Sequence, residues 1–323
     1  MTASSPQISS TVTQNPTSSE LVVEVRGLYK SFGNSKALRG LDLSVYRGSI
    51  HGFLGPNGAG KSTTIRTLLG LLSPEKAAGT VVKLLGYSPH NHPEVLRRVG
   101  YVPGEVALWP NLTGEETLRA LEKLRGVSVD RGKERQLISD FCLDTSRKVR
   151  EYSTGNRRKV LLVAAFSFNA ELYIFDEPTA GLDPLMENVF TQWCCQERDR
   201  GASILLSSHI MSEVEKLCDH ITVIKEGYAV DTGSVADLRH LSDVVITAVK
   251  PSPSSGESST ERVTITVPRD QSAERLRRLL DDGAQDITCN PASLEQIFLH
   301  HYELGEPYRE STRDREKSGE VEQ

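Results

Sequence analysis

The amino-acid sequence predicts an α/β fold, in which a mostly parallel sheet is flanked by helices and followed by a small α+β domain. Two patterns carry this prediction. Short apolar runs of strand length alternate with helical segments on both sides of a longer helical stretch, and the composition changes near residue 250. A chain of 323 residues is long enough for one large domain and a smaller one. We expect these domains at residues 21–241 and 242–304.

The strands of the large domain are expected from two kinds of apolar pattern. Leu41, Leu43 and Val45 alternate with polar residues, as in an antiparallel strand that buries one face. Continuous short apolar runs predict strands that are buried on both faces. The other candidates, in chain order, are Leu21–Arg26, Ile50–Leu54, Val81–Leu85, Val99–Val102, Leu172–Phe175, Ile204–Ser207 and Ile221–Ile224.

A helical insertion is expected between about residues 112 and 168. Leu118, Leu121 and Leu124 are spaced three apart, and apolar residues recur at helical spacing from Val160 onward. Because strands resume at Leu172, the insertion interrupts the sheet and does not end it.

The second domain is expected to combine strands and helices around a loop. Its loop is Lys250–Arg262, which is rich in Ser and Pro. The expected elements are strands at Val244–Val249, Val263–Val267 and Ile287–Cys289, a helix with Leu276, Leu279 and Leu280 on one face, and a last helix with Leu294, Ile297, Phe298 and Tyr302. Residues 1–20 and 305–323 are polar or charged and are expected to be disordered tails.

Composition excludes several classes of protein. Lys and Arg total 38 against 43 Asp and Glu, so a nucleic-acid partner is not expected. We interpret the basic clusters Arg147–Arg150 and Arg157–Lys159 as solvated helix ends. The five scattered cysteines suggest reduced thiols in a cytosolic protein. The sequence shows no secretory signal, and no apolar run reaches the length of about eighteen residues that spans a bilayer.

The most informative motif is GPNGAGKST, directly after the strand candidate Ile50–Leu54. It fits the P-loop pattern, in which a glycine-rich turn wraps backbone N–H groups around nucleotide phosphates. The residues expected to bind nucleotide are Gly55, Pro56, Asn57, Gly58, Ala59, Gly60, Lys61, Ser62 and Thr63. The three glycines are expected to adopt positive φ, Lys61 to neutralise the β- and γ-phosphates, and Ser62 to bind Mg²⁺. The helix that follows points its positive N-terminus at the anion.

Two further polar groups follow strands farther along the chain. In LYIFDEPTAGLDP, Asp176 ends a buried strand and is placed to hold Mg²⁺, while Glu177 is placed to polarise the attacking water. In ILLSSH, His209 ends another strand and is expected to contact the γ-phosphate. Glu177, His209 and Lys61 are therefore the predicted catalytic residues.

Together these motifs resemble the nucleotide-binding domain of ABC-type ATPases, over roughly residues 21–241. The resemblance implies that Phe32 in LYKSFG stacks on adenine. EYSTGNRRK lies where the signature motif of the family belongs, which makes Ser153 and Gly155 its phosphate-binding residues, and Asp183 falls on the D-loop. In that family the signature contacts nucleotide bound to the opposite subunit. The resemblance therefore implies a dimer that ATP closes and hydrolysis releases.

The sequence departs from the family pattern at two places. Gly104 in YVPGEVALWP occupies the position of a glutamine that reaches Mg²⁺, so either water fills the gap or Glu105 swings in, and we favour Glu105 as a metal ligand. Glutamine restored at position 104 should leave nucleotide binding intact. Thr154 and Asn156 replace the usual glycine and glutamine of the signature, and a β-branched residue restricts the backbone. We expect a working but slower site.

Features outside the ATPase motifs resemble the ATPase subunits of bacterial drug exporters of the daunorubicin- and tetronasin-resistance type. These features are GLDPLME, the YVPGE loop and the ending PASLEQIFLHHYE. The resemblance implies an ATPase that binds ATP and Mg²⁺ at the cytoplasmic face of the membrane and exports a drug or antibiotic through a separate integral membrane permease. The alternative is a soluble ABC-type ATPase that remodels a protein or ribonucleoprotein complex. Apolar Val106, Leu108 and Trp109 form either a buried hairpin core or an exposed docking groove for the membrane subunit.

Overall fold

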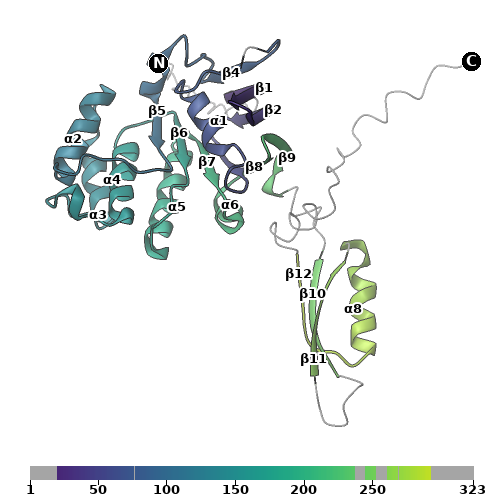
Figure 1. Cartoon of the computed structure of the whole chain (residues 1–323). Helices are drawn as coiled ribbons and strands as arrows, with labels where there is room; N and C mark the ends of the chain where they lie inside the picture. The colour runs from purple at the N-terminus through teal and green to yellow at the C-terminus, as the bar shows by residue number, and fades with distance from the viewer. Residues whose placement is uncertain (1–19, 76, 237–243, 252–259, 268, 292–323) are drawn as a thin grey trace, which may run out of the picture.

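The computed structural model describes residues 20–75, 77–236, 244–251, 260–267 and 269–291 (Figure 1). The expected last helix and the residues 1–19 and 305–323 of the two expected tails lie outside these residues, as does most of the expected loop 250–262. The ends of that loop belong to strands, because β10 (Val244–Pro251) continues to Pro251 and β11 (Thr260–Val267) begins at Thr260.

A six-stranded sheet forms the centre of the large α/β region. Its strand order is β5-β6-β7-β3-β8-β9, and every pairing is parallel except the last, between β8 and β9. The strands are β3 (Ile50–Leu54), β5 (Val99–Val102), β6 (Leu172–Asp176), β7 (Ser203–Ser208), β8 (His220–Lys225) and β9 (Tyr228–Ser234). The α/β fold class is confirmed. The edge strand β9 was not predicted, because its apolar run is only three residues long, from Tyr228 to Val230.

The large region also contains a second sheet, which is antiparallel and has the strand order β2-β1-β4. Its strands are β1 (Leu21–Phe32), β2 (Ser35–Tyr46) and β4 (Val81–Leu84). β1 is longer than the predicted Leu21–Arg26, since the apolar pattern breaks where the pairing of β1 with β2 shifts register between Val25 and Leu28. The extension matters because it carries Phe32 to the end of the strand.

Helices flank the parallel sheet and fill the expected insertion. The helices of this region are α1 (Lys61–Leu68), α2 (Gly114–Arg125), α3 (Arg131–Asp140), α4 (Thr154–Phe166), α5 (Pro184–Asp199) and α6 (Met211–Leu217), with 3₁₀ turns η1 (Pro93–Arg98) and η2 (Val149–Glu151). Thr113 and Glu116 form a capping box that starts α2. The helix predicted from Leu118, Leu121 and Leu124 is confirmed as α2, and Leu124 is exposed one residue before the helix ends.

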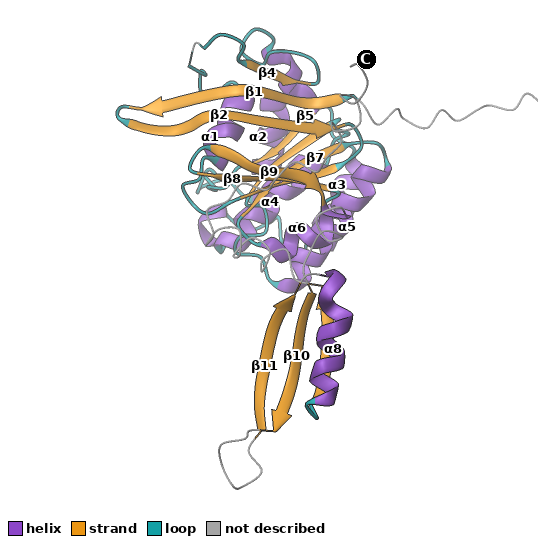
Figure 2. Ribbon diagram, turned by 90° about the vertical axis from the view of Figure 1, so that its right-hand side faces the viewer, coloured by secondary structure: helices purple, strands orange, loops and turns teal. Residues whose placement is uncertain are grey.

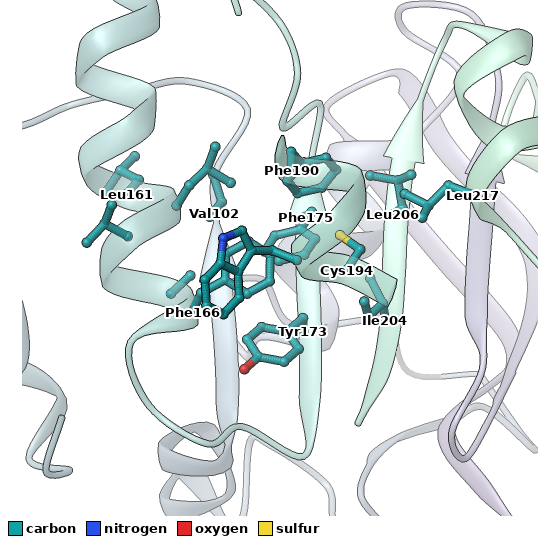
Figure 3. Packing of buried hydrophobic residues seen from close by; sticks show 14 of the residues in the cluster. Val102, Leu161, Phe166, Tyr173, Phe175, Phe190, Cys194, Ile204, Leu206 and Leu217 are labelled. Atoms are coloured by element: carbon teal, nitrogen blue, oxygen red, sulfur yellow. The ribbon is translucent and has the colours of Figure 1, made fainter. Parts of the chain in front are cut away.

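Alternate residues of the buried strands enter two different cores. On one face, Tyr173 and Phe175 of β6 pack with Phe166 of α4 and Phe190 of α5, as Figure 3 shows. On the other face, Ile174 packs with α1 and the antiparallel sheet. Two cores on opposite faces fix the strands in place and so fix the edge at which their carboxyl ends meet.

The C-terminal region forms its own small sheet of order β11-β10-β12, where β12 is Gln285–Pro291. Helix α8 (Ser272–Asp281), which follows the 3₁₀ turn η3 (Arg269–Gln271), lies along one face of this sheet in Figure 2. Leu279 of α8 packs with Ile246 of β10. The predicted face of α8 was wrong at Leu280, which is exposed, because only Leu276 and Leu279 face the sheet.

Among the described residues, no helix combines the length and apolar character needed to cross a membrane. The five cysteines are free thiols, and burial raises the pKa of the Cys194 thiol in α5 well above its ordinary value. Cys194 therefore packs the helix and is not poised for redox chemistry.

Candidate nucleotide site

The P-loop lies between β3 and α1 at the carboxyl edge of the parallel sheet. Gly58 and Gly60 adopt φ of 83° and 116°, in the left-handed region that favours glycine. The predicted positive φ was wrong for Gly55. Glycine is needed there for space, since a Cβ atom would lie 2.3 Å from the carbonyl oxygen of Ile224 in β8.

The start of α1 is open to an anion. No side chain caps this helix and no acidic residue lies in its first turn. Ser62 and Thr63, both half-buried, lie in that turn, while Pro56 and Asn57 are exposed. A helix N-terminus with free N–H groups attracts negative charge, so this end of the P-loop is suited to phosphate.

Lys61 is only 5 % exposed, and its ammonium group lies among acceptors. Its Nζ donates to the carbonyl oxygens of Gly55 at 2.6 Å and Pro56 at 3.3 Å, and it lies 3.2 Å from Oε1 of Glu177. A buried ammonium group needs such partners to offset lost hydration. The lysine charge is thus already held at the turn where phosphates are expected.

Asp176 ends β6 and is buried beside the P-loop strand's neighbour β7. Ser207, its register partner in β7, donates from Oγ to Oδ1 of Asp176 at 2.6 Å. Burial raises the pKa of the nearby Tyr101 hydroxyl to about 12, and the charge of Asp176 adds to that rise. The hydrogen bond fixes one carboxylate oxygen, which leaves the other oxygen to face Gly104.

Glu177 and His209 meet across two strand ends. The Nδ1 atom of His209 lies 2.6 Å from Oε2 of Glu177, and the His209 side chain is partly exposed to solvent. Glu177 itself has a φ of 50°, a strained conformation for a residue with a side chain. Strain of this kind is typical of positions that must aim a functional side chain.

Gly104 lies beside the acidic pair, after β5. A Cβ atom at Gly104 would lie 3.2 Å from Oδ2 of Asp176, so the backbone approaches the carboxylate closely. Glu105 is exposed, and within the described part of the chain no hydrogen bond or ion pair joins it to Asp176. The expectation that Glu105 binds the metal therefore stays a prediction.

The signature residues lie at the start of α4, against the D-loop of the same chain. A Cβ atom at Gly155 would lie 2.4 Å from the carbonyl oxygen of Gly181. Ser153 accepts a hydrogen bond from the N–H of Asn156 and caps α4, and Asp183 accepts from the N–H of Met186 and caps α5. Neither side chain contacts Lys61, Asp176, Glu177 or His209 in the described residues.

Phe32 is the last residue of β1. Its ring is 50 % exposed, and Nζ of Lys30 lies 5.4 Å from the ring centroid. An exposed aromatic face of this kind can stack on a base. The structure thus leaves the expected adenine platform open.

Sequence reasoning missed residues that organise the site from behind. Glu213 of α6 accepts from the hydroxyls of Thr179 and Ser208, each at 2.7 Å, and so ties the two turns that carry Glu177 and His209. Arg158 of α4 donates to the carbonyl oxygens of Glu177 and of Gly104, the latter at 2.7 Å. Burial lowers the pKa of the Arg158 guanidinium, and the charges of Glu177 and Asp176 oppose that shift.

The solvated interpretation of Arg157–Lys159 was therefore wrong, because Arg158 and Lys159 are buried. A signal was present in the spacing. Arg158 follows Gly155 by three residues on a helix, so both face the same side. Ser207 could have been found in the same way, since it precedes Ser208 and His209 at a strand end.

The arrangement suits hydrolysis of a phosphoanhydride. A held cation, a buried carboxylate and a second carboxylate braced by histidine meet at one sheet edge, as in phosphoryl-transfer sites. Asp176 and Ser62 fit Mg²⁺ by donor chemistry, because carboxylate and hydroxyl oxygens are ligands that a hard cation prefers. Among the described residues, no group of three or more His, Cys, Asp or Glu side chains forms a metal site by itself.

The sequence model of the ABC transporter family matches residues 38–180. The chain is 33 % identical over 292 residues to the daunorubicin/doxorubicin resistance ATP-binding protein DrrA of Streptomyces peucetius, a match covering 87 % of this chain and 86 % of that protein. It is 35 % identical over 209 residues to the bacitracin transport ATP-binding protein BcrA of Bacillus licheniformis, covering 64 % and 67 %.

Solved structures give the same picture of the fold. An ATP-binding subunit of an ABC transporter superposes with a TM-score of 0.62 at 32 % identity, covering 68 % of this chain and 92 % of that one. A dimeric bacterial ABC transporter cassette superposes with a TM-score of 0.58 at 18 % identity, covering 66 % and 98 %.

Proposed function

The chain belongs to the ABC transporter family and is an ATPase, and we propose that it dimerises on ATP and drives export of a drug or antibiotic through a separate membrane subunit. The observation that carries the proposal is the meeting of Lys61, Asp176, Glu177 and His209 at one sheet edge. The names of the relatives DrrA and BcrA support the choice of cargo, since both refer to antibiotics.

The proposed hydrolysis uses groups already positioned by the chain. The N-terminus of α1 and Lys61 bind the phosphates, and Glu177 accepts a hydrogen bond from the water that attacks the γ-phosphorus. The bond between the γ-phosphorus and its bridging oxygen breaks, which gives ADP and inorganic phosphate. His209 holds Glu177 in orientation. Mg²⁺ held by Asp176 and Ser62, with Glu105 as a further candidate ligand, would neutralise charge on the phosphates.

A second copy of the chain is proposed to complete the site. Ser153 and Gly155 lie at a helix N-terminus, which favours phosphate, and no nucleotide-binding residue of the same chain contacts them within the described ranges. Leu185 and Ile210 are exposed apolar residues next to Asp183 and His209. Apolar surface beside polar phosphate-binding groups is suited to a partner that closes over them. Asp183 would then lie at the junction of the two copies.

The membrane subunit is proposed to dock near Trp109. Val106 and Leu108 pack against the core, which fits the hairpin interpretation, but the Trp109 side chain is 44 % exposed. Trp109 follows directly from the loop that begins at Gly104, so a partner bound there would touch the edge of the catalytic site. This contact would hold the protein at the cytoplasmic face of the membrane.

The first test is affinity purification of the tagged full-length chain from detergent-solubilised membranes of its native host. The Glu177→Gln variant is used with ATP so that the closed state accumulates, and mass spectrometry identifies what co-purifies. A polytopic membrane protein in near-stoichiometric amount is expected. Recovery of soluble or ribosomal complexes alone would leave the ATPase assignment standing and overturn export in favour of a remodelling role.

A second test addresses the docking position. Trp109→Glu is expected to abolish co-purification of the membrane protein while ATP binding by the isolated chain is unchanged, because a carboxylate is costly in a desolvated interface. Leu71→Glu is the matched control, since Leu71 is also an exposed apolar residue but follows α1 and is not part of the segment from Gly104 to Trp109. Retained co-purification by Trp109→Glu would refute docking at this position.

A further inference from the structure

We propose that Arg158 is a positioning residue for ATP hydrolysis, because its guanidinium group ties the loop at Gly104 to the backbone of Glu177. The inference rests on ATP hydrolysis at this site and does not depend on export or on the identity of a membrane partner. It assigns a function to a buried cation that lies outside the phosphate-binding and metal-binding residues described above.

The guanidinium group of Arg158 donates hydrogen bonds to two separate backbone segments, and we call this pair of hydrogen bonds the clamp. The side chain projects from α4 and is only 3 % exposed. Its Nη1 donates to the carbonyl oxygen of Glu177, and its Nη2 donates to the carbonyl oxygen of Gly104 at 2.7 Å. These two carbonyls come from segments 73 positions apart in the chain, since they follow β5 and β6 respectively. A planar guanidinium with donors in a fixed fork holds both at once.

The clamp acts on a strained residue. Glu177 has a φ of 50°, which costs free energy for a residue with a side chain and persists only where surrounding contacts enforce it. Its N–H donates to Ser207, to the carbonyl oxygen at 3.1 Å and to Oγ at 3.3 Å. Arg158 holds the carbonyl on the other side of the same residue. Both backbone polar groups of Glu177 are therefore fixed, and its side chain can be aimed at Lys61 and His209.

The second hydrogen bond of the clamp goes to Gly104, whose loop lies next to the carboxylate of Asp176. Gly104 approaches Asp176 so closely that a Cβ atom would lie 3.2 Å from Oδ2. A displacement of this loop would pull on Arg158 and so on the carbonyl of Glu177. Small errors in the placement of a reacting group can cost about a hundredfold in rate, so such a displacement would change turnover. Arg158 thus makes the position of Glu177 depend on the position of Gly104.

The decisive variant is Arg158→Lys in the full-length chain. Lysine keeps the charge, but its single nitrogen cannot reproduce a fork that spans two carbonyls. We expect the kcat of basal ATP hydrolysis to fall at least about tenfold, while KM and directly measured ATP affinity change less than about twofold. The P-loop contacts of Lys61 are not touched by the substitution, which is why binding should survive.

Arg125→Lys is the matched control. Arg125 is also partly buried and donates from Nη1 to a backbone carbonyl, that of Ala164 at 2.7 Å, but it lies away from the catalytic edge. Its kcat should stay near that of the parent chain. In Arg158→Ala, millimolar guanidinium should restore part of the lost kcat, because the ion can occupy the vacated position and donate to the same carbonyls.

The outcomes separate positioning from a merely structural role. A fall in kcat alone, with thermal midpoints like that of Arg125→Lys, supports the proposal. Parent-like kcat in Arg158→Lys would overturn it, and so would parallel losses of kcat, ATP affinity and thermal stability. If Arg158→Ala does not fold, Arg158→Lys decides. Basal hydrolysis is measured without any membrane subunit, so a failure of the export proposal leaves this result readable.

Discussion

The two parts of the proposed nucleotide site, the P-loop half and the signature half, are built in opposite ways. In the P-loop half, side chains from different strand ends bind one another, as Lys61 and His209 both do with Glu177. In the signature half, Ser153 and Asp183 bind the N–H groups of their own helices. The first half is held together by tertiary contacts between charges, and the second by local helix caps.

This difference indicates how each half is used. In the P-loop half, Lys61 is already paired with Glu177. A bound phosphate would compete with Glu177 for the ammonium group of Lys61, so nucleotide binding is expected to rearrange these side chains. A capped helix N-terminus keeps its remaining N–H groups directed outward and gains little until an anion arrives from elsewhere. This contrast supports the proposal that a second copy of the chain is required to complete the site.

The largest expected effect comes from removal of the carboxylate charge of Glu177, which contacts both Lys61 and His209. Glu177→Gln keeps the size of the side chain but removes the carboxylate that orients water, so ATP turnover should fall at least about a hundredfold. ATP binding should persist, since the contacts of Lys61 with Gly55 and Pro56 remain. Steady-state phosphate release and equilibrium binding measure the two quantities.

The same variant also tests the comparison between the halves. If the signature half closes over ATP from a second copy, Glu177→Gln with ATP and Mg²⁺ should sediment as a dimer, and the parent chain with ADP as a monomer. Dimers that form equally well without nucleotide would mean that the signature half does not depend on the phosphate of the other chain.

The next effect is expected at the contact between signature and D-loop. Gly155→Ala places a Cβ atom 2.4 Å from the carbonyl oxygen of Gly181, so one of the two loops must shift. Turnover should fall about tenfold or more through displaced phosphate-binding N–H groups. ATP binding by the isolated chain should be unchanged, because the P-loop lies in the other half. A loss of binding by the monomer would contradict the separation of the two halves.

A smaller effect is expected beside Asp176, at Gly104 and Glu105. Glu105→Ala should lower turnover about tenfold if the carboxylate completes the metal coordination, and raised Mg²⁺ should restore part of the loss. Gly104→Gln should leave ATP binding intact, although its Cβ atom would press on Oδ2 of Asp176. Near-normal turnover of Glu105→Ala across a magnesium titration would remove Glu105 from the site.

The candidate residues of the P-loop half could be proposed from the sequence because their signals are local. Glycines at fixed spacing, an acidic pair after an apolar run and a histidine after another run each mark a strand end, and parallel strands bring their carboxyl ends to one edge. The same logic gave the α/β fold class. It assigned the wrong reason to Gly55, because crowding by the carbonyl of Ile224 in β8 is a long-range contact.

The supporting contacts could not be predicted because their partners are backbone atoms of distant segments. Arg158 binds carbonyls after β5 and β6, and a basic triplet before an apolar run is more often solvated. Helical spacing also placed Leu280 on the wrong face, since it defines a stripe but not where the neighbouring element stops. Which face of a helix is covered is decided by tertiary packing.

A last and smallest effect concerns the strand that carries the P-loop half. His51 of β3 is buried, its Nε2 lies 2.9 Å from Oγ1 of Thr222, and its ring stacks on that of His220. Burial, with a smaller contribution from the charge of His220, lowers the pKa of His51 to about 3. The unfolded chain then binds more protons than the folded one below the ordinary histidine pKa of 6.5, so stability is lost as pH falls from about 6.5 toward 3.

Each pH unit in that window should remove about 1.4 kcal/mol of the free energy of unfolding through His51 alone. His51→Phe should flatten this slope, and Thr222 keeps a partner because its hydroxyl lies 3.1 Å from that of Thr232. His90→Phe is the control, since His90 is exposed. Urea unfolding between pH 7 and pH 5 measures the slopes. If the parent chain and His51→Phe lose the same free energy of unfolding as the pH falls, a group other than His51 causes the acid sensitivity. The strand β3 would then not make the P-loop half more sensitive to acid than the signature half.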